Sequence, residues 1–377
     1  CAISPQSGKA VDVQGIAAGA LVEDPTVAGA RFRVPQNSTP GQQANSPRST
    51  GSGISGTWTN SKLTWVLNTD GSGRLIIPST NGTNTNYMTY NANASIGTNT
   101  YTGTTTVTGG ELQIEKTASL YNSDATKWTK ANISVAGGAT LAVNVGGAGE
   151  FTSAQAGTLL TSLTTSINNN GLLNGSTFAI NTHNAIADTT FGQEIRNSTG
   201  LGSGGLSFTK AGEGKLLLTA ANSYSFGTNV RGGALLINNT SGSGAGPGNI
   251  VVHDFATLGG TGSFSGAVTI RSGGTLAPGG SIETLGSGSL TFEDGSTFAY
   301  ETNSSAAPAV AGDLQIVDGY LTLSGTVNLD LIDLFAAFAE GTVLSLINYT
   351  AFWNGGLFSV DGQEIADGET FTSGLNT

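Results

Sequence analysis

The chain has 377 residues and a net charge of −11, with only 10% charged residues but 57 glycines. Because 37% of the residues are hydrophobic and recur in regular patterns, the composition excludes a disordered chain. The single cysteine excludes an internal disulfide, and no apolar run is long enough to span a bilayer, since Asp330 and Asp333 interrupt the longest one.

Residues 1–56 are expected to form an N-terminal arm and polar linker that is separable from the rest of the chain. Ala10–Val22 and Ala30–Val34 carry strand-like apolar residues, whereas Val34–Gly56 is rich in Pro, Ser, Gly and Gln and has no periodicity. A strand on a tether can add to an exposed sheet edge. Because the chain begins with Cys1 rather than Met, we expect a processed or trimmed product. For the cysteine itself we favour the interpretation that the chain simply starts there, over a lipid-modified N-terminus or an intermolecular thiol.

Two stretches of the chain, residues 99–143 and 222–260, repeat one module. In both, a tyrosine is followed at identical offsets by a valine, two glycines, a leucine and an isoleucine: Tyr101, Val107, Gly109, Gly110, Leu112 and Ile114, and Tyr224, Val230, Gly232, Gly233, Leu235 and Ile237. A second pair of short strands closes each copy, at residues 133–141 and 250–258, and recurs at 268–276. A short strand, a Gly-rich corner and a second short strand therefore form the repeating element.

The repeating element predicts one turn of a coil. Its apolar residues alternate with polar ones, so each strand has one apolar face, and the paired glycines supply the positive φ that a corner needs. One unit cannot bury this face alone, whereas stacked units bury a continuous column. A sandwich or a barrel is the alternative for any single strand. The nearly constant spacing of Leu235, Leu258, Leu276 and Phe298 favours the coil, and we expect Leu112, Ile114, Leu235, Ile237, Leu258 and Leu276 to point inward in aligned columns.

A helix is expected within an insertion near residues 151–170. Apolar residues recur there at helical spacing, from Phe151 through Leu159, Leu160 and Leu163 to Ile167. The residues Thr152-Ser153-Ala154-Gln155 fit a capping box, and the sequence Asn-Asn-Asn-Gly at 168–171 would end the helix. We expect Thr152–Ile167 to be a short amphipathic helix on the side of the solenoid, either as packed decoration or as a docking face.

Residues 206–224, with the sequence LSFTKAGEGKLLLTAANSY, resemble the repeats of autotransporter-associated β-strand repeat proteins. The later run GTLAPGGS at 274–281 is similar to the recurrent turn of that family, and Gly71–Ile77 resembles a degraded copy of the strand at 214–218. The resemblance covers roughly residues 70–300. It implies a right-handed parallel β-helix exported to the bacterial surface, and it implies no reaction and no catalytic residues.

The candidate catalytic groups in the sequence favour structural interpretations. His253 and Asp254 are adjacent, which on a strand sends them to opposite faces, so a surface histidine is expected there, as at His183. Gly200–Gly205 has the glycine spacing of a dinucleotide loop but precedes a strand rather than a helix, so it predicts a turn.

Hydrolases and lyases on β-helices need paired carboxylates, yet Gly214–Leu290 holds only two acids, Asp254 and Glu283, which lie more than one coil apart. Asn68–Gly71 lacks the terminal acid of a calcium loop. The sequence therefore predicts no catalytic, cofactor-binding or metal site, and no enzyme.

Charge is distributed unevenly along the chain. Residues 1–271 contain all 14 Lys and Arg against 12 acids, whereas residues 272–377 contain 13 acids and no basic residue. The acidic end disfavours nucleic acid and anionic membranes as partners. It is compatible with calcium bridging or with a basic patch on another copy of the chain.

These features predict an all-β protein, a right-handed parallel β-helix (solenoid) with a short amphipathic helical insertion and an extended N-terminal arm. We expect residues 57–300 to form the β-helix and residues 301–377 to form its acidic, apolar-stranded C-terminal end. The expected function is an extracellular or bacterial cell-surface structural protein that assembles head to tail with other copies of itself. A monomeric adhesin or a passenger that binds surface glycans is the alternative; scattered tryptophans (Trp58, Trp65, Trp128 and Trp353) show no aromatic row that would favour it.

Overall fold

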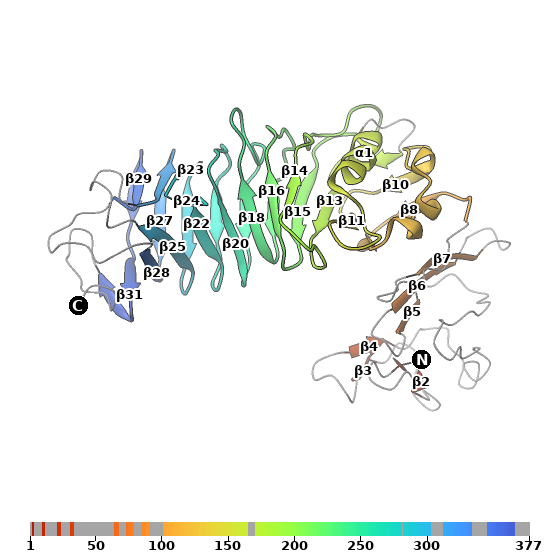
Figure 1. The fold of residues 1–377 in the computed structure, drawn as a ribbon, viewed down its shortest axis with the longest axis horizontal. Coiled ribbons are helices and arrows are strands. Elements are labelled where there is room, and N and C mark those ends of the chain that lie inside the picture. The colour runs from red at the N-terminus through yellow and green to blue at the C-terminus, as the bar shows by residue number, and fades with distance from the viewer. Residues whose placement is uncertain are drawn as a thin grey trace. The chain divides into compact units, whose positions relative to one another are not determined.

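The computed structural model describes residues 101–164, 170–280, 282–302, 312–333 and 345–365, and the backbone of seven short strands within residues 1–89. The chain forms two compact units. One comprises residues 1–103 and 114–128, and the other comprises residues 104–113 and 129–377. The two units are described separately below (Figure 1).

The first unit contains small antiparallel sheets and short helical turns. Strands β1 (Ala2–Ile3) and β2 (Ala10–Val11) pair, as do β3 (Leu21–Glu23) and β4 (Arg31–Arg33), and β5 (Thr64–Leu67), β6 (Gly73–Pro78) and β7 (Thr85–Thr89) form a three-stranded sheet. Three 3-10 helices follow at Thr117–Ser119, Tyr121–Ser123 and Ala125–Lys127. The segment around Leu75 resembles a strand of the parallel repeat, but it pairs antiparallel on both sides. The expected polar linker, Val34–Gly56, lies outside the described residues.

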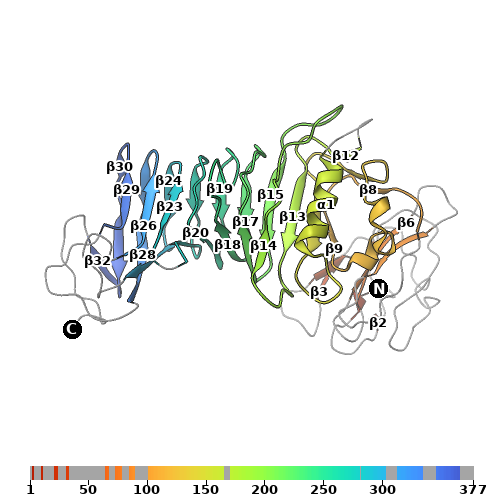
Figure 2. The ribbon, with the colours of Figure 1, turned by 45° about the horizontal axis from the view of Figure 1, so that its top comes forward.

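The second unit is a parallel β-helix, as the sequence predicts. Its largest sheet has ten strands, in the order β30, β27, β24, β21, β19, β17, β15, β13, β11, β9. From β9 upward these strands are Glu111–Ile114, Thr140–Asn144, Thr177–Asn181, Ser207–Ala211, Thr228–Val230, Ile250–Val252, Val268–Ile270, Leu290–Glu293, Leu321–Ser324 and Trp353–Asn354. Neighbours in the sheet come from successive coils, and the strands stack side by side in Figures 1 and 2.

The second sheet has nine strands, in the order β14, β16, β18, β20, β22, β25, β28, β31, β32. They are Thr189–Phe191, Lys215–Leu218, Gly233–Ile237, Ala256–Gly260, Thr275–Pro278, Thr297–Thr302, Thr326–Asp333, Leu357–Val360 and Gln363–Ile365. All pairs in it are parallel except the last, where β32 turns back antiparallel along β31. Two three-stranded sheets complete the coils: β8 (Thr105–Val107), β10 (Ile133–Val135) and β12 (Gly171–Leu172), and β23 (Thr284–Ser287), β26 (Leu314–Val317) and β29 (Ile347–Tyr349).

The core is built from columns of apolar side chains that repeat from coil to coil. On the nine-stranded sheet one column runs in register through Leu216, Leu235, Leu258, Leu276, Phe298 and Leu329, each at most 5% exposed. The sequence separation within this column varies, from 18 residues between Leu258 and Leu276 to 31 between Phe298 and Leu329. The loops absorb this difference, so the strands stay in register although the spacing along the sequence is only approximately constant.

The two copies of the module lie on different sheets, which corrects the expectation of one set of columns. All six expected residues are buried, but Leu112 and Ile114 belong to the ten-stranded sheet, whereas Leu235 and Ile237 belong to the nine-stranded one. The module encodes only a strand, a corner and a strand, and each coil uses this arrangement at more than one corner. The same local sequence therefore fits either corner.

The predicted helix is present as α1 (Ser153–Leu163) and is the only α-helix within the described ranges. Thr152 accepts a hydrogen bond from the backbone N–H of Gln155, and the Gln155 side chain accepts one from the N–H of Thr152, which completes the capping box. The helix ends at Leu163; residues 165–169 are not described. In the chain, α1 follows β11. Later coils have a strand of the nine-stranded sheet at the corresponding point. The helix packs against β14, the edge strand of that sheet.

No helix among the described residues is long and apolar enough to cross a membrane. The coils continue through β26 to β32, within the segment that we expected to form the C-terminal end of the solenoid. Part of the apolar segment expected at this end, residues 334–344, lies outside the described residues.

Candidate functional site

Three basic side chains occupy equivalent positions on three successive coils of the ten-stranded sheet. Val230, Val252 and Ile270 pair in register and point into the core, and each is followed directly by a basic residue. Because successive residues of a strand point to opposite faces, the basic residues lie on the outer face. We call Arg231, His253 and Arg271 the basic row; adjacent members come from strands about 4.8 Å apart.

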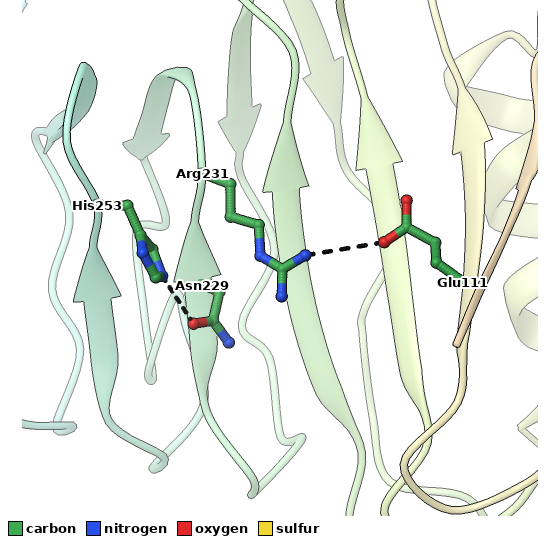
Figure 3. A network of polar contacts seen from close by, with 4 residues as sticks. All are labelled: Glu111, Asn229, Arg231 and His253. Carbon is green, nitrogen blue, oxygen red and sulfur yellow. Dashed lines mark hydrogen bonds and ion pairs between the residues drawn. The ribbon is translucent and has the colours of Figure 1, made fainter. Parts of the chain in front are cut away.

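His253 is the centre of the basic row and uses both ring nitrogens. Its Nε2 lies 3.1 Å from Oδ1 of Asn229, and its Nδ1 lies 3.5 Å from Nη1 of Arg271 (Figure 3 shows the former contact). A guanidinium can only donate, so Nδ1 accepts and Nε2–H donates to Asn229, which requires the neutral imidazole. Burial, Arg271 and Arg231 lower the pKa of His253, and Asp254 opposes them.

Arg231 forms an ion pair that crosses the outer face of the sheet. Its guanidinium lies 3.8 Å from the carboxylate of Glu111 on β9, although β11, β13 and β15 separate β9 from β17 in the sheet order (Figure 3). On these intervening strands the residues Ala142, Ala179 and Thr209, which alternate with the core residues, are small and are themselves buried. At 3.8 Å the contact is longer than a hydrogen bond, and both side chains are about half exposed, so the pair contributes little to stability.

The charge of Arg271 is not neutralised by a direct ion pair within the described ranges, where its contact is with His253. Glu293 occupies the next position of the row, because Ile270 pairs with Phe292. The basic row is therefore three coils wide, with Glu293 beyond Arg271 and Glu111 reaching towards Arg231.

A fourth basic residue, Lys210, lies on β15, next to the strand β17 that precedes Arg231, but its side chain points into the solenoid. It pairs in register with Val230 and is fully buried. Its ammonium donates to the carbonyl oxygens of Ala211 at 3.0 Å, Gly212 at 2.7 Å and Gly232 at 2.8 Å. Burial lowers the pKa of Lys210 to about 8. Lys210 thus ties the corners of two successive coils together and is not accessible to a ligand.

Asp313 is a buried acid with a comparable structural role at the acidic end. Its two carboxylate oxygens accept hydrogen bonds from the backbone N–H groups of Glu283 at 3.1 Å and Glu301 at 3.0 Å. Burial raises the pKa of Asp313 to about 6, and the nearby Glu301 and Glu283 act in the same direction. Asp313 therefore connects segments of two coils.

The structure does not assemble the groups considered in the sequence into a catalytic constellation. His183 is exposed in a turn after β13, where its backbone N–H donates to Asn181, and residues 200–205 form a turn before β15, as expected. Asp254 lies in the turn before β20, and Glu283 precedes β23, so they stay on different coils. Within the described ranges no group of three His, Cys, Asp or Glu side chains could hold a metal ion. Asn68–Gly71 lies outside these ranges.

The basic row was not predicted from the sequence. The signal was present, because Val230-Arg231 and Ile270-Arg271 both precede a Gly-rich corner at the same point of the repeat. Glu111 carried no such signal, since its contact with Arg231 depends on how the coils stack.

Comparison with known proteins confirms the resemblance inferred from the sequence. The family model described as passenger-associated-transport-repeat matches residues 96–114, 208–237 and 256–277, which include β8, β9, β16 to β18, β20 and β21 and most of β15 and β22. The chain is also 33% identical over 136 residues to the adhesin BmaC autotransporter of Brucella suis biovar 1 (strain 1330). This match covers 35% of the present chain and 4% of the relative, so the chain corresponds to a small part of that protein's length.

Proposed function

We propose that this autotransporter-associated repeat protein, which carries the repeats of exported passengers, is a non-enzymatic stalk with an adhesive outer surface. The observation that carries the proposal is the pair of sheets, with ten and nine strands, that share one core and are parallel except for the final β31–β32 pair. Every coil is hydrogen-bonded to the next on at least two sides. Such a rigid rod can hold an adhesive surface away from the cell that displays it, and it is less suited to opening and closing around a substrate.

Side chains in the corners between the strands also link successive coils by hydrogen bonds. Oδ1 of Asn222 accepts a hydrogen bond from the backbone N–H of Ile195 at 2.7 Å, and its Nδ2 donates to the carbonyl of Gly244 at 2.5 Å. Asn222 thereby links the coil before it to the coil after it. Such cross-links between coils favour a rigid stalk.

The non-enzymatic assignment rests on how the described acids are used. Glu150, Glu283 and Asp313 accept hydrogen bonds from backbone N–H groups and so stabilise corners. A glycoside hydrolase instead needs two carboxyl groups that face one substrate. The test is to incubate the purified chain with plant and animal polysaccharides and to measure reducing ends. A turnover that disappears on mutation of one of these acids would refute the assignment.

The adhesive assignment follows from the relative, whose name describes an adhesin. Beads coated with the purified chain are expected to bind cultured epithelial cells several times more often than beads coated with the heat-unfolded chain. Equal binding by both preparations would refute an adhesive surface that depends on the β-helix.

A second candidate is head-to-tail assembly into a fibre or surface layer. The uneven charge favours it, since residues 1–271 carry 14 basic residues and 12 acids whereas residues 272–377 carry 13 acids alone. In this proposal Ala10–Val34 pairs with a neighbouring copy, and an open filament results if the contacts do not close. Deleting residues 1–56 should leave a folded chain that no longer elongates in negative-stain images. Fibres of unchanged morphology would exclude the arm, and an intact chain that stays monomeric at high concentration would exclude the fibre.

A further inference from the structure

We propose that the basic row binds an anionic group, a sulfate or a carboxylate, of a polysaccharide. This inference rests on the proposed adhesive function and names the class of ligand for it. The site consists of Arg231, His253 and Arg271 with the amide of Asn229, all on the outer face of the ten-stranded sheet.

The two guanidiniums are spaced to hold one anionic group or two on neighbouring sugars. They belong to strands two positions apart in the sheet, a separation of about 10 Å, with His253 between them. Guanidinium groups bind carboxylate and sulfate-like oxygens through paired N–H donors, which makes arginine the suitable residue for such ligands. Because the Arg231–Glu111 contact is longer than a hydrogen bond, the donors of Arg231 can turn to a ligand at little cost.

The face around the row suits a sugar. The outward positions in register with Asn229 are Val251, Thr269, Thr291, Thr322 and Asn354. Four of these five side chains carry a hydroxyl or an amide, which can hydrogen-bond sugar hydroxyls. A polysaccharide lying along the solenoid would meet this row of polar groups beside its charged contact.

The charge pattern favours a polysaccharide over a nucleic acid. A nucleic acid carries one phosphate for each nucleotide, so a strand lying across the row would bring further charges against Glu293 and Glu111. It would also approach the acidic part of the chain, residues 272–377. A sugar chain with spaced anionic groups can place one group on the basic row and only neutral hydroxyls beyond it.

Binding of an anion should be coupled to the protonation of His253. The charged groups that face its ring are Arg271 and Arg231, which disfavour the imidazolium, and Asp254, which favours it; Asn229 is neutral. An anion placed over the row offsets the two arginines, and the protonated Nδ1 can then donate to it. The pKa of His253 is therefore higher in the complex than in the free protein, and affinity increases as the pH falls through that range.

The direct test is calorimetric titration of the whole 377-residue chain with a heparin oligosaccharide, which is sulfated, and with an oligogalacturonate of equal length, which carries only carboxylates. Arg231→Gln with Arg271→Gln should weaken binding of the preferred sugar at least about tenfold, or about 1.4 kcal/mol. The matched control, Arg196→Gln with Lys215→Gln, removes the same charge from exposed positions outside the row and should change affinity less than about twofold. An equal loss in both double variants, or no binding of either sugar, would overturn the proposal.

A second readout follows the two histidines by NMR titration. Saturating sugar should raise the pKa of His253 and leave the ring chemical shifts of His183, the other histidine of the chain, unchanged at constant pH. His253→Gln should retain sugar binding but lose its dependence on pH. Equal shifts at both histidines, or single-stranded DNA of the same charge binding as tightly as the sugar, would overturn the assignment. If the arginine double variant loses sugar but its beads still bind cells, adhesion uses another surface and the proposed function stands without this site.

Discussion

Leu235 offers the sharpest test of the stacked core. It is fully buried on β18, with Leu216 directly before it and Leu258 directly after it in the same column. Replacing Leu235 with alanine leaves a cavity that these neighbours cannot fill, because both are held in place by their own strands. The next residue, Leu236, points to the outer face of the same strand and is only half buried. Leu236→Ala is therefore a matched control, with the same chemical change and the same strand.

The expected magnitude follows from burial. A buried leucine replaced by alanine loses about 3–5 kcal/mol of unfolding free energy when the site cannot collapse. A half-buried leucine at the surface should lose less than about 1 kcal/mol. Leu235→Asp should be more severe still, because no donor lies in the apolar column to pair with a carboxylate, and the variant is expected not to fold.

Because coils contact mainly their neighbours, the loss should also be local. Urea unfolding followed by circular dichroism gives the overall change, and hydrogen exchange measured by mass spectrometry gives its position. In Leu235→Ala, protection should fall most in residues 215–260 and least beyond residue 314. Equal destabilisation by Leu235→Ala and Leu236→Ala, or a loss of protection spread evenly over all coils, would refute the column as the source of stability.

Lys210→Met should lower the free energy of unfolding at pH 7 by about 2–4 kcal/mol, since three partly buried carbonyls at the corners lose their charged donor. Because the pKa of Lys210 falls from 10.5 to about 8 on folding, urea titrations should show wild-type stability rising between these pH values relative to the variant, and a constant difference would contradict this cause. Asp313→Asn tests the opposite sign: folding raises the pKa of Asp313 from 3.8 to about 6, so wild-type stability should fall relative to the variant as the pH rises from about 4 to 6, whereas parallel curves would exclude it. Thr152→Ala removes the helix cap and should destabilise α1 by about 1 kcal/mol, measured by hydrogen exchange of residues 153–163, while Thr158→Ala on its exposed face should cost less than about 0.5 kcal/mol; similar effects would argue against the cap.

The inward positions of the coils could be predicted because they recur at similar spacing. Leu235, Leu258, Leu276 and Phe298 all fall in one column of the structure, as their spacing indicates. The helix was predictable for a different reason, since the capping box of Thr152 is local in sequence. Both patterns lie within short segments, so they can be recognised without knowledge of the fold.

The sheet to which a segment belongs could not be predicted. Leu112 and Leu235 have the same local sequence context yet lie on different sheets, because the module specifies a corner and not which corner of the coil. For a similar reason, the basic row was not predicted from the sequence. Arg231, His253 and Arg271 come together only through the register of β17, β19 and β21, and the loops between them differ in length. Glu111 is 120 positions away from Arg231, so only the stacking of coils could reveal their contact.

The parallel ladder has a mechanical consequence. In a β-helix the hydrogen bonds between coils run along the solenoid axis. Tension along this axis therefore acts directly on these bonds and separates the coils one at a time. Successive residues of the Leu235 column are 18 to 31 positions apart. Each coil that detaches would therefore release roughly 60–110 Å of extended chain. A parallel β-helix pulled in this way is expected to lengthen stepwise while the remaining coils stay folded, and each step dissipates part of a sudden load.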